Sequence, residues 1–218
     1  VKVGITPEGK AKLIDGEDML FRCFEAVMEA RHKAIRINNA ENFAAVLACD
    51  NDVEAMADVL EAAINRGAPR LANLFRIHIG GDFYSANYLR AWFLVARRFP
   101  MMHFFAYTKS IRHLINVGYY PNSGRNEAPS NINIVASYGG RNDALIREYG
   151  MRSALVVYSE AEAAALGLQI DHDDSLAAFG SESFALLLHG TQAKGTEASE
   201  ALKLINREKK AAALAAVA

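Results

Sequence analysis

The sequence predicts an α/β fold built on a mostly parallel sheet of five to six strands, arranged as a partial TIM-like barrel or as an open doubly wound sheet. Three observations carry this prediction. Five short apolar runs lie between residues 75 and 188, a helix-like segment follows most of them, and the runs start 22 to 30 residues apart. That interval fits one strand, one helix and two loops, and alternating strands and helices are typical of parallel sheets.

The first seventy residues read as the mainly helical N-terminal part of a single domain. Apolar residues recur there at intervals of three and four, which indicates helices, and Asp52 has a side chain suited to cap one of them. The elements expected in this part are a short strand at 2–7, a helix at 18–38 with a break near its end, and a helix at 52–65.

The β/α core of the domain is expected at 71–206 and a helical tail at 207–218. Ser85 and an S-x-x-E capping box mark helix starts within the core. The polar segment 171–183 is expected to be a loop. The expected strands lie at 75–79, 103–107, 132–136, 154–158 and 184–188, and the expected helices between them start near 85, 111, 142 and 159.

Composition and charge set limits on compartment and partners. Hydrophobic residues make up 51% of the chain and charged residues 22%, as in ordinary globular proteins. The net charge of −1 provides no field that favours nucleic acid or an anionic membrane, so neither partner is indicated. No apolar run approaches the roughly 18 residues that span a bilayer, and no secretory signal is visible. Together with only two cysteines, Cys23 and Cys49, this predicts a cytoplasmic protein.

Chemically able side chains follow the first predicted strand. Asp82 is a candidate catalytic base, metal ligand or hydrogen-bond anchor, and the alternative is that it only ties down the turn. His78 is a second catalytic candidate, and the period of two places it on the same side of the strand as Arg76. Gly80 and Gly81 let the backbone turn sharply or let a ligand approach, so they are candidate binding residues.

The next two strands end in similar clusters. Lys109 is a candidate catalytic amine or anion-binding group, although a surface lysine fits the pattern equally well, and Tyr107 and Thr108 are candidate binding residues beside it. Ser137 and Arg141 flank a glycine-rich turn. Its backbone amides, with Arg141, are suited to hold a phosphate or carboxylate, and a tight strand–helix turn is the alternative.

The last two strands add further candidates. Ser159 is a candidate binding residue, and His172 with Asp174 is the best pair of ligands in a run that otherwise reads as a solvated acidic loop. His189 is a candidate acid or base, or a structural histidine, and Gln192 a candidate binding residue. The C-terminal ends of parallel strands meet at one edge, so His78, Asp82, Lys109, Arg141, His172 and His189 are expected to converge there.

These candidates leave three classes of function open. The first is an enzyme, or an enzyme-derived protein, that binds a small anionic or nucleotide-like ligand at the ends of the strands. The second is a non-catalytic protein that binds a host or phage partner, and the third is a virion or assembly component. A metal is not specified. If one binds, Asp82 and His172 with either Asp174 or His189 suit a divalent ion that prefers oxygen and imidazole ligands.

Several of these motifs, in this order, resemble the phage family of gene product 88. The resemblance covers about residues 71–206 and implies a phage origin, hence the cytoplasm of the host cell, more than it implies an activity. The motifs that carry it are 75–85, Trp92, 96–98, 105–110, 135–141, 171–175 and 185–192.

The resemblance also implies a relation to radical S-adenosylmethionine barrels. Members of the family commonly carry an N-terminal cysteine-rich stretch ending in Cys-Tyr-Ala, which is similar to the cluster-binding loops of those barrels. This sequence departs from the pattern, because only Cys23 corresponds. Either the cluster is lost in this member or upstream residues supply the thiols. A [4Fe–4S] site needs three or four thiolates, so we expect no such cluster on this chain, and the cofactor stays open.

Overall fold

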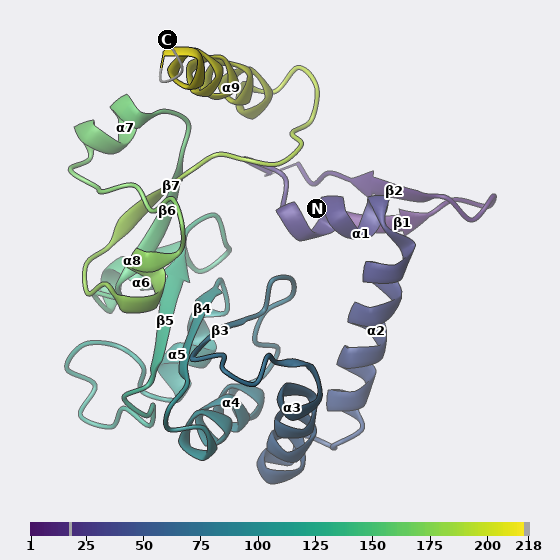
Figure 1. Cartoon of the computed structure of the whole chain (residues 1–218), viewed down its shortest axis with the longest axis vertical. Helices are drawn as coiled ribbons and strands as arrows, with labels where there is room; N and C mark the ends of the chain where they lie inside the picture. The colour runs from purple at the N-terminus through teal and green to yellow at the C-terminus, as the bar shows by residue number, and fades with distance from the viewer. Residues whose placement is uncertain (18, 216–218) are drawn as a thin grey trace. The chain divides into compact units, whose positions relative to one another are not determined.

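The computed structural model describes residues 1–17 and 19–215 (Figure 1). By its internal contacts the chain divides into two compact units. The first unit comprises Val1–Ile37, Val156–His172 and Phe184–Ala218, and the second comprises Asn38–Leu155 and Asp173–Ser183. The single domain expected from the sequence stays a prediction.

A five-stranded sheet has the order β3-β4-β5-β6-β7. The pairings β3–β4, β4–β5 and β5–β6 are parallel, and β6 contributes residues to both units. The predicted α/β fold with a mostly parallel sheet is confirmed. The strands follow one another in the sheet in the order of the sequence, as in a partial barrel. The change of direction in strand order that marks a doubly wound sheet does not occur among these strands. The strands are β3 Leu74–Ile77, β4 His103–Thr108, β5 Ile132–Ser137, β6 Ser153–Val157 and β7 Phe184–Leu187.

The helices of the second unit begin close to where the sequence predicts them. The Asp52 carboxylate accepts the Ala55 N–H at 2.8 Å, and the Ser85 hydroxyl accepts the Tyr88 N–H at 3.0 Å, so both predicted caps are present. The predicted helices are α3 Val53–Gly67, α4 Ala86–Arg98, α5 Ile111–Asn116 and α6 Asp143–Glu148. A further helix, α8 Ser175–Phe179, lies in the segment that was expected to be a loop.

One face of the sheet in the second unit forms the hydrophobic core against α4. Phe104 is fully buried, and its ring lies 5.6 Å from that of Phe75 and 6.4 Å from that of Trp92 in α4. Helix α3 packs on α4, and the Arg98 guanidinium contacts three carboxylates of α3 at 2.7–2.8 Å. The acidic partners of Arg98 are Glu54, Asp58 and Glu61.

The opposite face of the same strands is more polar and carries α8. A ring nitrogen of His103 lies 2.6 Å from the Ala178 carbonyl, and the Asn133 amide donates to the same carbonyl at 3.1 Å. The Arg152 guanidinium donates to the carbonyl of Leu176. The expectation of a loop over 171–183 is therefore wrong for the α8 residues, because side chains distant in sequence satisfy the helix's terminal carbonyls.

The first unit begins with a feature that the sequence analysis missed. Strands β1 Lys2–Ile5 and β2 Ala11–Ile14 pair antiparallel, so the start of the chain is a hairpin and not a single strand followed by helices. Gly9, with φ of 77°, supplies the left-handed residue in the connection. Two turn bonds close it, from the Gly9 N–H to the Thr6 carbonyl and from the Thr6 N–H to the Lys10 carbonyl.

The helix expected at 18–38 is divided. Its first part is α1 Phe24–Arg31, and α2 Lys33–Leu47 begins after a break at His32 and extends beyond the predicted end. Asp18, the expected start, lies outside the described residues. Helix α2 continues from the first unit into the second, which starts at Asn38. The first unit also contains α7 Glu160–Ala165 and α9 Glu197–Ala215, and α9 includes the described part of the helical tail expected at 207–218.

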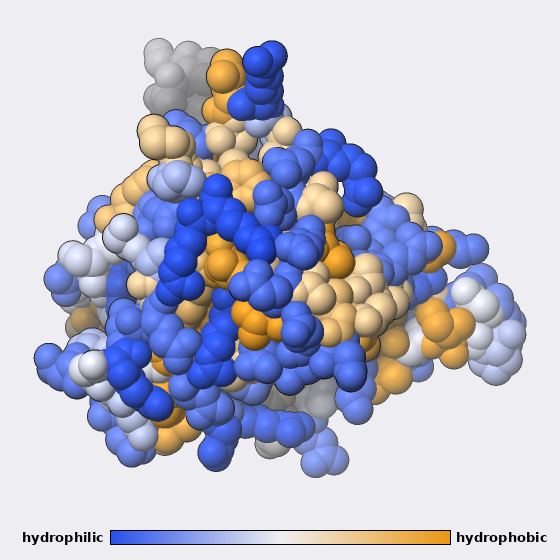
Figure 2. Space-filling view, turned by 90° about the horizontal axis from the view of Figure 1, so that it is seen from below, coloured by the Kyte–Doolittle hydropathy of each residue, from blue (hydrophilic) through white to orange (hydrophobic). Residues whose placement is uncertain are grey.

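No helix in the described part of the chain is long and apolar enough to cross a membrane. Figure 2 shows hydrophilic residues over much of the face in view, with hydrophobic residues interspersed among them.

Candidate functional site

Asp82 lies in the turn between β3 and α4 and is held by three donors. Its carboxylate accepts the Thr108 hydroxyl at 2.5 Å, the Lys109 N–H at 2.8 Å and the Phe83 N–H at 2.7 Å. Thr108 is 2% exposed and ends β4, so the carboxylate ties the turn after β3 to the end of the neighbouring strand. Of the roles considered for Asp82, these contacts favour the hydrogen-bond anchor.

We expect the change Asp82→Ala to lower the free energy of unfolding by about 2 kcal/mol, because three donors beside a buried threonine lose their acceptor. Urea denaturation followed by circular dichroism measures the change. Asp82→Asn keeps one acceptor oxygen and should lose less. Stability equal to that of the unchanged protein would show that other contacts fix this turn.

Lys109 follows β4 and turns toward β5. Its ammonium group donates to the Ser137 hydroxyl at 2.9 Å and to the Tyr138 carbonyl. The neighbouring backbone amide of Lys109 already binds Asp82, so the residue joins the ends of three strands. Asp82 and Lys109, two of the residues expected to converge, are therefore in contact, and Ser137 is bonded to Lys109.

Arg76 and Tyr107 share the polar face of the sheet with α8. The Arg76 guanidinium contacts the Asp174 carboxylate at 2.8 Å, and the Tyr107 hydroxyl donates to the other oxygen of that carboxylate at 2.8 Å. The Arg76 guanidinium also lies over the Tyr107 ring, 5.1 Å from its centroid. The side chains of Arg76 and Asp174 are 37% and 34% exposed, so a solute can reach the pair.

The expected orientation of His78 is wrong. Strand β3 ends at Ile77, and His78 has φ of 59°, so the alternation of the strand does not continue to it. Its ring lies 4.9 Å from that of Phe83, and a ring nitrogen lies 3.0 Å from the Tyr88 hydroxyl. These partners pack on the α4 face, opposite Arg76. Burial there lowers the pKa of His78 to about 4, although the charge of Asp82 raises it slightly.

The glycine-rich turn after β5 already holds an anionic group of the protein. The Gly139 and Gly140 N–H groups both donate to the Asp143 carboxylate at 2.9 Å. The amides that the sequence analysis assigned to a phosphate or carboxylate therefore bind a carboxylate from the start of α6. Arg141 is exposed beside them. Asp143 was not among the sequence candidates, although its position at a helix start after two glycines was a usable signal.

Four further candidates, Ser159, His172, His189 and Gln192, lie in the first unit. The Ser159 hydroxyl caps α7 by accepting the Glu162 N–H at 3.1 Å. The Gln192 amide donates to the His189 carbonyl at 2.9 Å and accepts the Arg22 N–H at 2.8 Å. His172 is exposed. The expected convergence of His172 and His189 with the second-unit residues stays a prediction.

Gly80 and Gly81 lie in the turn between His78 and Asp82, and Gly81 has φ of 84°, which a residue with a side chain rarely adopts. Among the described residues, no three or more His, Cys, Asp or Glu side chains are placed to hold a metal ion. Cys23 and Cys49 are both free thiols.

The fold and the site define an α/β protein with a cluster of cationic and hydroxyl-bearing side chains at the ends of parallel strands. The chain belongs to the Gene product 88 family, whose sequence profile matches residues 19–213. The predicted phage family is thus confirmed, whereas the relation to radical S-adenosylmethionine barrels stays a prediction.

Two curated relatives are phage proteins. The Gene 88 protein of Mycobacterium phage D29 is 45% identical over 56 residues, and that of Mycobacterium phage L5 is 43% identical over 56 residues. In both cases the match covers 26% of this chain and 22% of the relative. No solved structure matches the chain.

Proposed function

We propose that the protein binds a small anionic ligand at the carboxyl ends of β3, β4 and β5, as an enzyme or an enzyme-derived binding protein in the cytoplasm of the phage's host. The observation that carries the proposal is the carboxylate of Asp174 between Arg76 and Tyr107. Its two oxygens mark positions 2.8 Å from a guanidinium nitrogen and from a phenol hydroxyl. A phosphate or carboxylate group of a ligand can accept hydrogen bonds from the same two donors.

Displacement of the Asp174 carboxylate by the anionic group of a ligand costs little free energy. An ion pair that is about one third exposed contributes only about 0–1 kcal/mol, so a competing anion displaces the carboxylate at little cost. The Arg76 guanidinium is planar and suited to bidentate contact with a phosphate or carboxylate. The ring of Tyr107 beneath it fixes the orientation of the guanidinium.

Lys109 provides a second cation at the carboxyl ends of the strands. It is half-buried, and its ammonium group is held by oxygen atoms of Ser137 and Tyr138. Asp82 fixes the backbone from which this side chain projects. In this arrangement Arg76 and Lys109 bind charge, Tyr107 and Ser137 supply hydroxyl groups, and Asp82 positions Lys109.

The test is calorimetric titration with inorganic phosphate, pyrophosphate and adenosine monophosphate at low salt. Arg76→Gln and Lys109→Met should each weaken binding of the anion that binds best by about 10- to 100-fold, the loss of one charge-assisted contact. Asp174→Asn should strengthen it, because a competing carboxylate is removed. Arg112→Gln, which changes an exposed arginine bonded to Asn142, is the matched control.

Two results would contradict the proposal. The first is the absence of saturable binding of any of the three anions by the folded protein. The second is an equal loss of affinity in Arg76→Gln and in the control Arg112→Gln. That result would show that the loss comes only from the change in net charge.

A further inference from the structure

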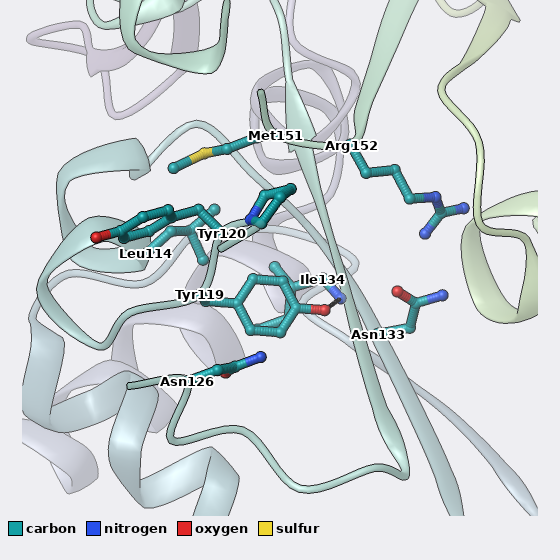
Figure 3. A pocket seen from close by; sticks show the side chains of 9 residues that line it. Leu114, Tyr119, Tyr120, Asn126, Asn133, Ile134, Met151 and Arg152 are labelled. Carbon is teal, nitrogen blue, oxygen red and sulfur yellow. Dashed lines mark hydrogen bonds between the residues drawn. The ribbon is translucent and has the colours of Figure 1, made fainter. Parts of the chain in front are cut away.

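A pocket of about 230 Å³ lies in the second unit near the amino end of β5, whereas the candidate site lies at the carboxyl ends of the strands (Figure 3). It is formed near the amino end of β5, at Asn133 and Ile134, and beside Met151, which precedes β6. The candidate anion site uses the other end of β5, at Ser137. The pocket is therefore separate from the candidate anion site.

The walls of the pocket are two tyrosine rings held in place. The Tyr119 hydroxyl accepts the Ile134 N–H at 2.8 Å, and burial raises the pKa of Tyr119, so it keeps its proton. The Tyr120 ring meets the Tyr149 ring edge to face at 4.9 Å. The side chains of Leu114, Ile134 and Met151, each less than about a tenth exposed, complete an apolar floor. Rings fixed in this way lose little freedom when a ligand stacks on them.

The loop that carries these rings is ordered by arginines of α4. Residues 118–130 contain no helix or strand. The Arg90 guanidinium binds the Glu127 carboxylate at 2.8 and 3.1 Å, and Arg97 donates to the Glu127 carbonyl. The Asn126 side chain accepts the Ala128 N–H at 3.0 Å, and its amide edge faces the pocket at the surface. Long loops that are anchored in this way commonly serve binding.

The lining favours a neutral ligand. Arg152 is its one charged residue, and the Arg152 guanidinium donates to the backbone carbonyls of Glu182, Ala177 and Leu176. Figure 3 shows this side chain extending away from the tyrosine rings. Among the described lining residues there is no carboxylate to attract a cation, and the Arg152 guanidinium is already bonded to backbone carbonyls, so an anion would have to compete with those bonds.

We propose that this pocket binds a single neutral heteroaromatic ring system of nucleobase size. The tyrosine rings offer stacking faces, and the Asn126 amide offers hydrogen bonds to ring nitrogens or ring carbonyls. The volume of about 230 Å³ is large enough for one planar ring system. The inference is independent of the anion site at the other end of β5.

The experiment is titration of the isotope-labelled protein with neutral small molecules, followed by amide chemical shifts. Adenine and uracil should bind saturably with dissociation constants of about 0.1–5 mM, as expected for fragments of this size. Benzoate, which is charged, and cyclohexanol, which is not aromatic, should bind at least tenfold more weakly. The shifts should be largest for Tyr119, Tyr120 and Met151.

Two variants locate the binding. Asn126→Ala changes an exposed side chain and Tyr120→Leu removes a stacking face, and each should weaken adenine binding by about tenfold. Asn122→Gly, in the same loop, keeps the positive φ of that position and lies outside the lining, so it should leave binding unchanged. Circular dichroism establishes that each variant is folded. If Tyr120→Leu is unfolded, the adenine affinity of Asn126→Ala alone tests the proposal.

Four results would overturn the inference, and the first three concern affinity. They are the absence of saturable adenine and uracil binding, equal affinity for cyclohexanol, and adenine binding that Asn126→Ala and Tyr120→Leu leave unchanged. Shifts confined to Arg76, Tyr107 and Lys109 would likewise place the ring at the anion site and overturn it.

Discussion

Changing Phe104 to Ala is expected to lower the free energy of unfolding by about 3–5 kcal/mol, the usual cost of removing a buried aromatic side chain from a packed core. Phe104 is fully buried in the second unit. Its ring contacts the rings of Phe75, Trp92 and Phe99, at centroid distances of 5.6, 6.4 and 6.5 Å. Removal of the ring therefore leaves a cavity whose walls belong to a strand and a helix that cannot easily close it.

Urea denaturation at pH 7 measures this loss. The matched control is Phe179→Ala in α8, because Phe179 is 66% exposed and stacks on one side only, against His103. The control should cost less than about 1 kcal/mol. Equal losses for the two phenylalanines would mean that the Phe104 side of the sheet is not the main core.

Stability is expected to fall by about 3 kcal/mol when the pH is lowered from 7 to 4, as a result of His78 alone. Burial lowers the pKa of His78 from 6.5 to about 4 in the folded protein, so between these values the unfolded chain binds more protons. The contribution is fully present above pH 6.5 and is lost as the pH falls toward 4. At that pH the ring beneath Phe83 and Tyr88 must accept a charge, and one of its nitrogens there has no hydrogen-bond partner.

The measurement is a series of urea denaturation curves at half-unit intervals between pH 4 and 7. His78→Gln removes the titrating ring and should flatten the dependence on pH over this range. His172→Gln, which changes an exposed histidine, is the control and should keep the slope. A slope that persists in His78→Gln would assign the pH dependence to other groups.

The strand pattern could be predicted from the sequence because parallel strands buried on both faces read as continuous apolar runs. All five runs are strands, and the caps at Asp52 and Ser85 form as their side chains suggest. The contacts of Asp82, Lys109 and Ser137 also follow from their positions, because Lys109 directly follows β4, Ser137 ends β5 and Asp82 lies in the turn after β3.

The remaining features depend on backbone angles and on long-range contacts. The positive φ of His78 moves its side chain to the other face, and no alternation of residue types reveals such an angle. Helix α8 is five residues long, too short to show a period, and side chains of His103, Asn133 and Arg152 stabilise its end. The pocket at Tyr119 arises because Arg90 and Arg97 hold a loop that reads only as a polar connection.

The sequential order of the sheet bears on how the chain acquires its structure during synthesis. Each strand from β4 to β7 pairs with the strand made just before it, so no strand waits for a partner that is translated later. Each parallel pair is separated by a single crossover, so each pairing closes a smaller loop than a pairing between distant strands would close. The sheet can therefore grow one strand at a time as the ribosome delivers it, and each new strand pairs with the edge that the previous strand left open.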